Sequence, residues 1–422
     1  MILNGNEMQR RVVITGMGVI APNGQDLDAF WQTVRDGVSA AGPITRFDTA
    51  KMPNKVGCEI RDFDGSRYMD AKKSRRLDLS IQYEVAASVL AARDAGIEFA
   101  DLDADRVGVV EGTSVSGLES TFRNHRNFLD RGYRAISPFT MINGYFGAGS
   151  GEIALELGIR GQALSYSTGS ASGNDVMGYA LRTIQLDEAD LMIAGGTEAP
   201  LLEPFWGVFC QTKVMTRRND QPKEAMRPFD RTRDGFLLGE GAAFVVLEEL
   251  SHALARGAKV YAEVAGHGRS CEAFDSVAPH PEGVGMCRAM QKALKHARMH
   301  SSEIDYINVH GTATGSNDVV ETKAIKAVLG EHAKRVAVSS TKPVTGHLLG
   351  AAGALETVIC ALAIQHQAIP PTLNLNEPEA DCDLDYVPNR CRPFPLRNVM
   401  NLSTGFGGKN SCLVLRRLMS RE

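Results

Sequence analysis

Several features that define other protein classes are missing from this sequence. The 8 cysteines of the 422-residue chain include no pair with C-x-x-C spacing, so neither a zinc site nor a redox motif is indicated. We expect these cysteines to be reduced thiols. Positive charge is not in excess, because the formal net charge is −4, and this argues against a nucleic-acid-binding protein.

Long apolar runs are missing as well. The longest, at about residues 351–369, is interrupted by Glu356, Gln365 and His366, and it predicts a buried core helix instead of a membrane span. The segment from Met1 to Arg11 lacks the apolar stretch of a secretory signal. We therefore expect a soluble, cytoplasmic protein with no membrane partner.

What the chain does contain is an alternation of short apolar runs and longer segments with helical spacing. This alternation is typical of an α/β protein in which helices cover a parallel or mixed sheet. Strands are predicted at residues 11–15, 107–111, 191–194, 243–247, 306–309 and 336–339. Helices are predicted at residues 27–36, 79–95, 174–185, 283–297, 319–329 and 350–365.

The chain divides into two related halves in this interpretation. A polar stretch at residues 250–258 marks the junction, so we predict an N-terminal half at 1–256 and a C-terminal half at 257–422. Residues 163–184 and 336–362 both show a strand, a small-residue turn and a glycine-bearing helix. That repeat places Ser170 and the segment with Lys342 and His347 at related positions.

One motif indicates nucleotide binding only at first sight. Residues 16–21, Gly-Met-Gly-Val-Ile-Ala, match the dinucleotide fingerprint and follow a predicted strand. However, Pro22, Asn23 and Gly24 come next, where the fingerprint requires a helix whose N-terminus holds the pyrophosphate. We interpret the motif as a structural turn.

Ser170 opens the predicted helix 174–185 in a run of small residues. A side chain at the first turn of a helix faces free backbone N–H groups and the positive end of the helix dipole. That setting lowers the pKa of a thiol and makes it reactive. A serine hydroxyl gains far less, because it stays protonated near neutral pH unless a base takes its proton.

Three more segments combine polar side chains with glycines at the ends of predicted strands, where ligand clefts of open α/β sheets form. They span residues 309–318, 339–347 and 403–410. Taken singly, each has an ordinary structural interpretation: a hydrogen-bonded histidine, a surface lysine or a tight turn. A metal site is not indicated, because His310 and His347 lack clustered carboxylate or thiol ligands.

Taken together, these segments resemble the β-ketoacyl-acyl-carrier-protein synthases, condensing enzymes of the thiolase fold, along nearly the whole chain. The resemblance implies an α/β, thiolase-like fold in which two similar halves form a layered αβαβα core, and it implies a homodimer. It also implies no bound cofactor, because phosphopantetheine arrives on the carrier protein. The matching motifs are residues 12–18, 194–198, 227–230, 233–236, 310–312, 341–347 and 405–408.

The same resemblance assigns roles to individual residues. Ser170 falls on the position of the nucleophilic cysteine, His310 and His347 on the two histidines, and Lys342 on the lysine. Thr312 and Thr314 would contact the pantetheine arm, and Phe406 with Gly407 would gate the acyl pocket. The basic run Lys72, Lys73, Arg75 and Arg76 would meet an acidic carrier protein, although a solvated helix start explains its charge equally well.

The chain departs from the family pattern around these residues. Gly169 and Ala171 flank Ser170, Gly315 and Asn317 replace a proline and a glycine, and Thr404 replaces a phenylalanine. The central departure is serine itself. Acyl loading requires a thiolate, whereas decarboxylation of a malonyl thioester requires donors for the developing oxyanion, which two neutral imidazoles supply.

This combination resembles the Cys-to-Ser ketosynthase-like decarboxylases of polyketide β-branching cassettes. We therefore predict conversion of malonyl- to acetyl-acyl carrier protein without elongation, for an HMG-synthase-like enzyme that acts later. Two alternatives remain. One is an elongating synthase with a natural serine or an engineered Cys-to-Ser change. The other is a non-catalytic subunit similar to a chain-length factor, although such subunits tend to lose the histidines that this chain keeps.

Overall fold

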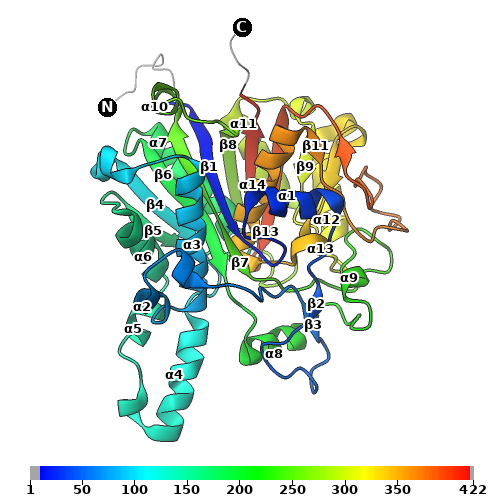
Figure 1. The fold of residues 1–422 in the computed structure, drawn as a ribbon. Helices are drawn as coiled ribbons and strands as arrows, with labels where there is room; N and C mark the ends of the chain where they lie inside the picture. The colour runs from blue at the N-terminus through cyan, green and yellow to red at the C-terminus, as the bar shows by residue number, and fades with distance from the viewer. Residues whose placement is uncertain (1–9, 419–422) are drawn as a thin grey trace.

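The computed structural model describes residues 10–418, and its central sheet is built from two halves with the same strand order. The strand order is β10-β9-β13-β14-β8-β1-β7-β6-β4-β5 (Figure 1). Counted from either edge to the middle, it gives the third, second, fourth, fifth and first strand of one half. The first half contains β1 (Val12–Ile20), β4 (Val107–Gly112), β5 (Ala163–Tyr166), β6 (Leu191–Glu198) and β7 (Gly241–Glu249). The second contains β8 (Ala262–Cys271), β9 (Tyr306–Asn308), β10 (Ala337–Ser339), β13 (Asn398–Gly405) and β14 (Lys409–Arg416).

Strand directions repeat in the same way. β4 pairs parallel with β5 and β6, as β9 does with β10 and β13, and the remaining pairs in each half are antiparallel. The halves meet where β1 pairs antiparallel with β8, with Val13 opposite Glu263. The prediction of two similar halves is confirmed. The chain crosses between them through α10 (Leu250–Ala255), and the domain division at 256/257 stays a prediction.

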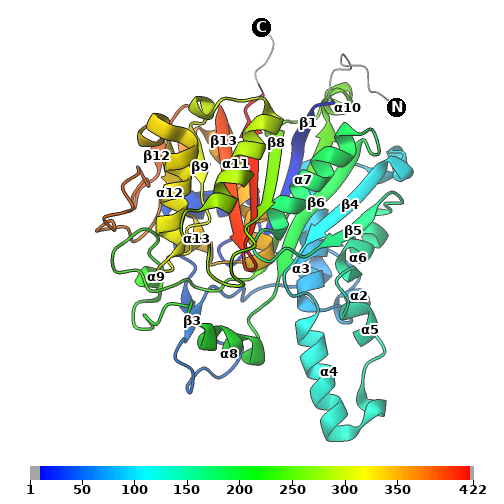
Figure 2. The same ribbon diagram turned by 180° about the vertical axis from the view of Figure 1, so that it is seen from behind.

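Helices form three layers around the two half-sheets (Figures 1 and 2). α7 (Ser172–Gln185) and α14 (Ala352–His366) pack on each other and contact strands of both halves. α3 (Leu79–Asp94) covers β1 and β7 on one outer face, and α11 (Val284–Ala297) with α12 (Asn317–Leu329) covers the other. The segment Leu349–His366 is apolar and long enough to span a membrane, but 89% of it is buried inside the fold. The predicted core helix is confirmed.

The G-x-G motif lies inside a strand and not in a turn, which corrects the sequence interpretation. β1 continues from Val12 to Ile20 instead of ending at residue 15. A Cβ atom at Gly16 would lie 2.3 Å from the carbonyl oxygen of Ala91, and one at Gly18 would lie 2.1 Å from that of Ala87. Both glycines therefore let α3 pack closely on β1, and the next helix begins only at Leu27, beyond the end of the strand at Ile20.

The remaining elements surround this core. The helices are α1 (Leu27–Asp36), α2 (Ala71–Ser74), α4 (Leu118–Arg131), α5 (Thr140–Asn143), α6 (Ala148–Leu157), α8 (Glu203–Thr212), α9 (Pro222–Ala225) and α13 (Lys342–Thr345). Two small antiparallel pairs are β2 (Gly42–Pro43) with β3 (Val56–Gly57) and β11 (Ala368–Ile369) with β12 (Arg392–Pro393). α4 and α5 extend away from the body beside the edge strand β5 (Figure 1).

Candidate active site

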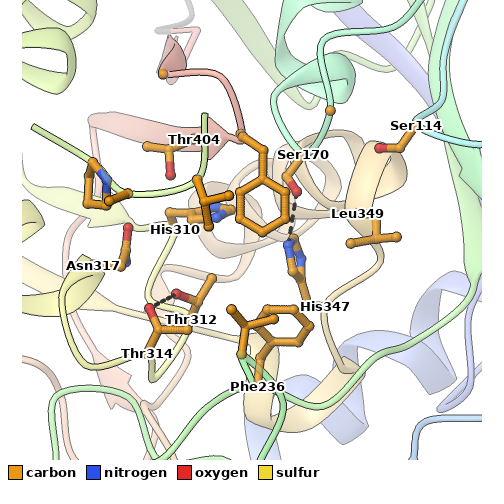
Figure 3. Close-up of a pocket in the computed structure, with 18 of the residues that line it drawn as sticks. Ser114, Ser170, Phe236, His310, Thr312, Thr314, Asn317, His347, Leu349 and Thr404 are labelled. Atoms are coloured by element: carbon orange, nitrogen blue, oxygen red, sulfur yellow. Dashed lines mark hydrogen bonds between the residues drawn. The ribbon is translucent and has the colours of Figure 1, made fainter. Parts of the chain in front are cut away.

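The polar segments predicted from the sequence converge because they follow equivalent strands of the two halves. Ser170 comes after β5, the third strand of the first half, and His347 comes after β10, the third strand of the second. His310 follows β9, the neighbour of β10. The structure therefore brings Ser170, His310 and His347 to one pocket, as Figure 3 shows.

The turn that carries Ser170 is held by its own backbone and by one hydroxyl. Gly169 has φ +62°, a left-handed conformation that favours glycine. The Ser172 hydroxyl accepts from the backbone N–H of Thr168 at 2.9 Å and donates to the Gly169 carbonyl at 2.6 Å. These bonds orient the Ser170 side chain toward the second half, where its Oγ lies 3.0 Å from Nε2 of His347.

The two histidines form a buried pair of perpendicular rings. The ring centroids of His310 and His347 are 5.2 Å apart at 86°, and the Phe236 ring meets His347 edge-on at 5.1 Å. Burial, together with the positive charge of Lys342, holds the pKa of both imidazoles well below the usual range. Both rings are therefore neutral near pH 7.

The hydrogen bonds of these rings indicate which nitrogen carries the proton. Nδ1 of His310 and Nδ1 of His347 are buried without a hydrogen-bond partner among residues 10–418. An unpaired buried N–H is rarer than an unpaired buried acceptor. We infer that each ring is protonated at Nε2, which makes each ring a donor.

Lys342 acts from behind the histidines and does not line the pocket. Its ammonium is buried and donates to Glu356 Oε1 at 2.5 Å, and Ser403 donates to the other carboxylate oxygen at 3.5 Å. Burial raises the pKa of Glu356, and the charge of Lys342 opposes that rise. Sequence analysis missed Glu356 because it treated this residue only as an interruption of an apolar helix.

Buried carboxylates also hold the backbone of the active-site loops, and sequence analysis missed them. Glu321 accepts from the N–H groups of His310 and Gly311 at 2.7 and 2.8 Å, and burial raises its pKa to about 7. Glu198 accepts from the N–H groups of Val115 and Gly350, and burial likewise raises its pKa to about 7. Glu198 stood in the family motif at residues 194–198, but sequence analysis gave neither glutamate a role.

The pocket is a cavity of about 350 Å³ with a polar end and an apolar wall. Thr312 and Thr314 line it, with their hydroxyl oxygens 3.0 Å apart (Figure 3), and the half-exposed Phe406 ring lines it as well. Gly407 does not line it, although its neighbours in the turn do. The apolar wall, which sequence analysis missed, consists of Phe205, Phe209, Val214, Phe236 and Leu349.

The predicted docking run is only partly free. Lys73 Nζ lies 3.1 Å from Glu152 and 2.9 Å from Glu156 on α6, so its charge is neutralised within the chain. The Arg76 guanidinium lies 4.9 Å from the centroid of the Phe139 ring. Lys72, Arg75 and Arg76 are exposed. Among the described residues, Lys73 is the cation of the run whose charge is paired within the chain, and docking of a carrier protein on this run stays a prediction.

The site contains no arrangement suited to a resident metal within the described chain. Among residues 10–418, no three His, Cys, Asp or Glu side chains are grouped so as to hold an ion. The side chains that line the pocket with His310 and His347 are mainly hydroxyl-bearing or apolar. The chemistry available here is therefore that of two neutral imidazole donors, one hydroxyl and a paired lysine.

Comparisons with known proteins agree with this geometry. The family descriptions "Beta-ketoacyl synthase, N-terminal domain" and "Beta-ketoacyl synthase, C-terminal domain" match residues 9–253 and 261–376. The 3-oxoacyl-[acyl-carrier-protein] synthase 2 of Coxiella burnetii is 43% identical over 97% of this chain and 99% of its own length. The corresponding protein of Synechocystis is 42% identical over 98% of this chain and 99% of its own.

Solved structures give the same result. The ishigamide ketosynthase/chain length factor superposes with a TM-score of 0.92 at 37% identity, covering 98% of this chain and 100% of that one. A β-ketoacyl synthase from Burkholderia phymatum superposes with a TM-score of 0.90 at 33% identity, covering 97% and 100%. With both family domains matched and the predicted thiolase-like fold observed, the chain belongs to the β-ketoacyl synthase family.

Proposed function

We propose that this protein decarboxylates a malonyl group carried on acyl carrier protein and releases acetyl-carrier protein without chain elongation. The observation that carries the proposal is the contact between Ser170 and His347, in which a hydroxyl faces a neutral imidazole while the second histidine is intact. The site keeps its donors and has no thiol at position 170.

The decarboxylation step uses the histidines as paired donors. With the thioester oxygen between Nε2–H of His310 and Nε2–H of His347, the bond from the α-carbon to the carboxylate breaks and CO₂ leaves. The electron pair becomes an enolate whose oxygen receives both hydrogen bonds, and a proton from solvent then converts the α-carbon into the methyl group of acetyl. A preorganised donor of this kind typically contributes ~3–4 kcal/mol to lowering the barrier.

The serine at position 170 disfavours acyl loading, the other half-reaction of a condensing enzyme. Loading of an acyl group onto Ser170 requires a base that takes the hydroxyl proton. Of the ring nitrogens, His347 Nε2 is the one within 3.0 Å of Oγ, and in the tautomer inferred above it already carries a proton. The same tautomer that stabilises the enolate therefore leaves the hydroxyl without a base.

The carrier protein is the proposed partner. Thr312 and Thr314, with paired hydroxyls at the polar end of the cavity, suit the amides of a pantetheine arm. A similar solved structure, 31% identical, is described as a type II PKS acyl-carrier protein in complex with its ketosynthase. Lys72, Arg75 and Arg76 are the exposed cations of the predicted docking run. The HMG-synthase-like pathway enzyme and the cytoplasmic location stay predictions.

A second copy of this chain is the proposed occupant of the exposed edge at β5. This strand pairs on one side with β4 and ends the sheet, so its other side presents free backbone groups. Exposed apolar side chains cluster on the neighbouring segments: Leu129, Tyr133, Met141, Tyr145, Phe146, Leu155 and Leu164. A two-fold contact would pair the two β5 edges and bury this apolar surface.

A Leu164→Glu variant tests this interface. It should elute as a monomer in size-exclusion chromatography with light scattering, and a variant that remains dimeric would contradict the interface.

A serine-dependent elongating synthase is the second candidate. It is favoured by the 3.0 Å distance from Ser170 to His347, which also suits proton transfer, and by the name of the bacterial relatives. An engineered Cys-to-Ser change belongs to this class and predicts that Ser170→Cys restores condensation. A partner subunit similar to a chain-length factor has support from the name of one similar structure, but it does not account for the retained histidines.

Intact-mass spectrometry separates these functions. Malonyl-carrier protein incubated with the enzyme should lose CO₂ and become acetyl-carrier protein, whereas His310→Ala should leave it unchanged. A parallel reaction with an acyl-carrier primer should give no β-ketoacyl product and no acylated enzyme. Persistent malonyl-carrier protein, or a β-ketoacyl product, would contradict the proposal. An acyl adduct on Ser170 would favour the elongating synthase.

A further inference from the structure

A buried carboxylate–imidazole pair lies directly behind the turn that carries Ser170, and the mechanism above does not use it. Asp175, in the first turn of α7, accepts from the Thr168 hydroxyl at 2.8 Å. Its other carboxylate oxygen lies 3.4 Å from Nε2 of His267. Thr168 is two residues before Ser170, so this pair is coupled to the turn by one hydrogen bond.

His267 reaches Asp175 from the other half of the molecule. It lies on β8, and its Nε2 is also 3.0 Å from the Ser411 hydroxyl on β14. The ring packs against Gly178 of α7, where a Cβ atom would lie 2.1 to 2.3 Å from the ring atoms. Glycine is thus required at this position for the imidazole to reach α7, which indicates a specific contact between the two halves.

The Asp175 carboxylate is ionised at this buried position. Burial acts to raise the pKa of Asp175, but the nearby imidazole of His267 and the hydroxyl of Thr168 outweigh burial and lower it. The N-terminal end of a helix normally stabilises an anion on a nearby side chain. A negative charge in the first turn of the same helix opposes that stabilisation.

We propose that Asp175 is a positioning residue that fixes the Ser170 turn through Thr168 and, by its negative charge, makes the side chain at position 170 harder to deprotonate. The biological purpose of this role rests on the proposed decarboxylase function, because a neutral hydroxyl at position 170 suits a site that forms no acyl-enzyme. The electrostatic effect itself can be measured without any turnover.

The other charged groups near these residues lie on separate elements. On the pocket side, the two histidines of the site are neutral, and Lys342 is paired with Glu356. Around Asp175, the imidazole of His267 comes from β8. Burial raises the pKa of the nearby Tyr166 phenol, the charge of Asp175 raises it further, and the charge of Arg269 lowers it. Asp175 is thus the acidic group of the α7 first turn.

The experiment places a thiol at the position as a reporter. In a Ser170→Cys background, the pH dependence of iodoacetamide alkylation, followed peptide by peptide in a mass spectrometer, gives the pKa of that thiol. Asp175→Asn removes the charge and keeps an acceptor for Thr168, whereas Thr168→Val removes the hydrogen bond and keeps the charge. Exposed Cys271, alkylated in the same samples, is the internal reference.

The proposal predicts that Asp175→Asn lowers the pKa of the reporter thiol by about one unit, a tenfold change in the ionisation constant. Thr168→Val should leave the pKa nearly unchanged but slow the decarboxylation of the Ser170 protein, because the turn loses its anchor. An unchanged pKa in Asp175→Asn, or an equal shift in Thr168→Val, would overturn the electrostatic role. The two results on the pKa of the reporter thiol are independent of whether the enzyme decarboxylates malonyl-carrier protein, so the electrostatic role can fail while the proposed function stands, and the reverse.

A second variant covers the case in which Asp175→Asn does not fold. His267→Gln removes the imidazole that faces Asp175, so the carboxylate is less neutralised and the pKa of the reporter thiol should rise. A fall or no change would overturn the proposal. Thermal unfolding of each variant identifies those that fold, and only folded variants enter the comparison.

Discussion

The hydroxyl oxygen of Ser170 and Nε2 of His347 lie 3.0 Å apart across the boundary between the two halves of the fold. In a serine hydrolase this distance would belong to a nucleophile and its base. Here the histidine is buried and neutral, and its Nδ1 has no hydrogen-bond partner in the part of the chain that the structure describes, so no third group there orients it as a base. The contact is better understood as a donor held in place for a substrate oxygen.

Removal of either histidine donor should therefore slow decarboxylation strongly. His310→Ala and His347→Ala are each expected to lower kcat by about 10²–10³-fold, the usual cost of losing one oxyanion donor. KM for malonyl-carrier protein should change little, because Thr312 and Thr314, the proposed contacts of the pantetheine arm, are left in place. Steady-state kinetics by mass spectrometry checks this, with Lys326→Ala on the exposed face of α12 as a control. Full activity in His310→Ala would contradict the paired-donor mechanism.

The activity should not fall as the pH decreases through the ordinary pKa of histidine. Burial and Lys342 lower the pKa of His310 and His347, so both rings remain neutral below pH 6.5. The unfolded chain does bind protons in that range, so the stability of the fold should decrease as pH falls below about 6.5. Initial rates at pH 5.5 to 8, with thermal unfolding at each pH, test both parts. A rate that titrates near pH 6.5 would show that the rings ionise in the folded enzyme.

Lys342 should matter more to the fold and to the pH profile than to substrate binding. Lys342→Met removes a buried ammonium and leaves the Glu356 carboxylate without its partner, and breaking such a pair typically costs about 3–5 kcal/mol. Loss of the positive charge also removes one cause of the lowered pKa values of the histidines. The variant should unfold at lower temperature, and its activity should begin to fall at a higher pH on acidification.

A double variant provides the matched control for that prediction. Lys342→Met with Glu356→Gln removes both charges, so most of the lost stability should return while the shifted pH profile remains. If the double variant is as unstable as the single one, the ion pair is not the source of the stability.

Much of this fold could be predicted from its periodic apolar segments, but the site could be predicted only in part. The strand at residues 306–309 and the helix at 79–95 have strong local patterns, so sequence alone located them. The continuation of β1 through Gly16 and Gly18 was missed, because the close approach of α3 that requires those glycines is a tertiary contact. Ser170, His310 and His347 were found as motif residues. Glu356, Glu321 and the apolar wall, only part of which lies on α8, were missed because their roles depend on partners distant in sequence.

A buried pair of glutamates on the outer face of the first half leads to the last prediction. Glu84 of α3 and Glu111 of β4 are fully buried, and both carboxyls approach the same point above Gly149. Neither oxygen of Glu84 has a partner among the described residues, whereas Glu111 accepts from Ser165. Burial raises the pKa of both groups, and for Glu84 the charge of Glu111 raises it further. One proton shared between them satisfies both carboxyls.

A glutamate whose pKa is raised by folding stabilises the native state less as the pH rises, because the unfolded chain loses its proton from about pH 4.5 while the folded chain retains it. Glu84→Gln mimics the protonated form at every pH, so it should raise the free energy of unfolding at pH 8 by about 1 kcal/mol or more and change it little at pH 4.5. Urea unfolding at the two pH values measures this difference. Glu98→Gln, at an exposed position shortly after α3, is the control and should show a much smaller dependence on pH. A Glu84→Gln protein that is less stable at pH 8 would mean that the buried pair is held ionised, and that its charges are compensated within the fold.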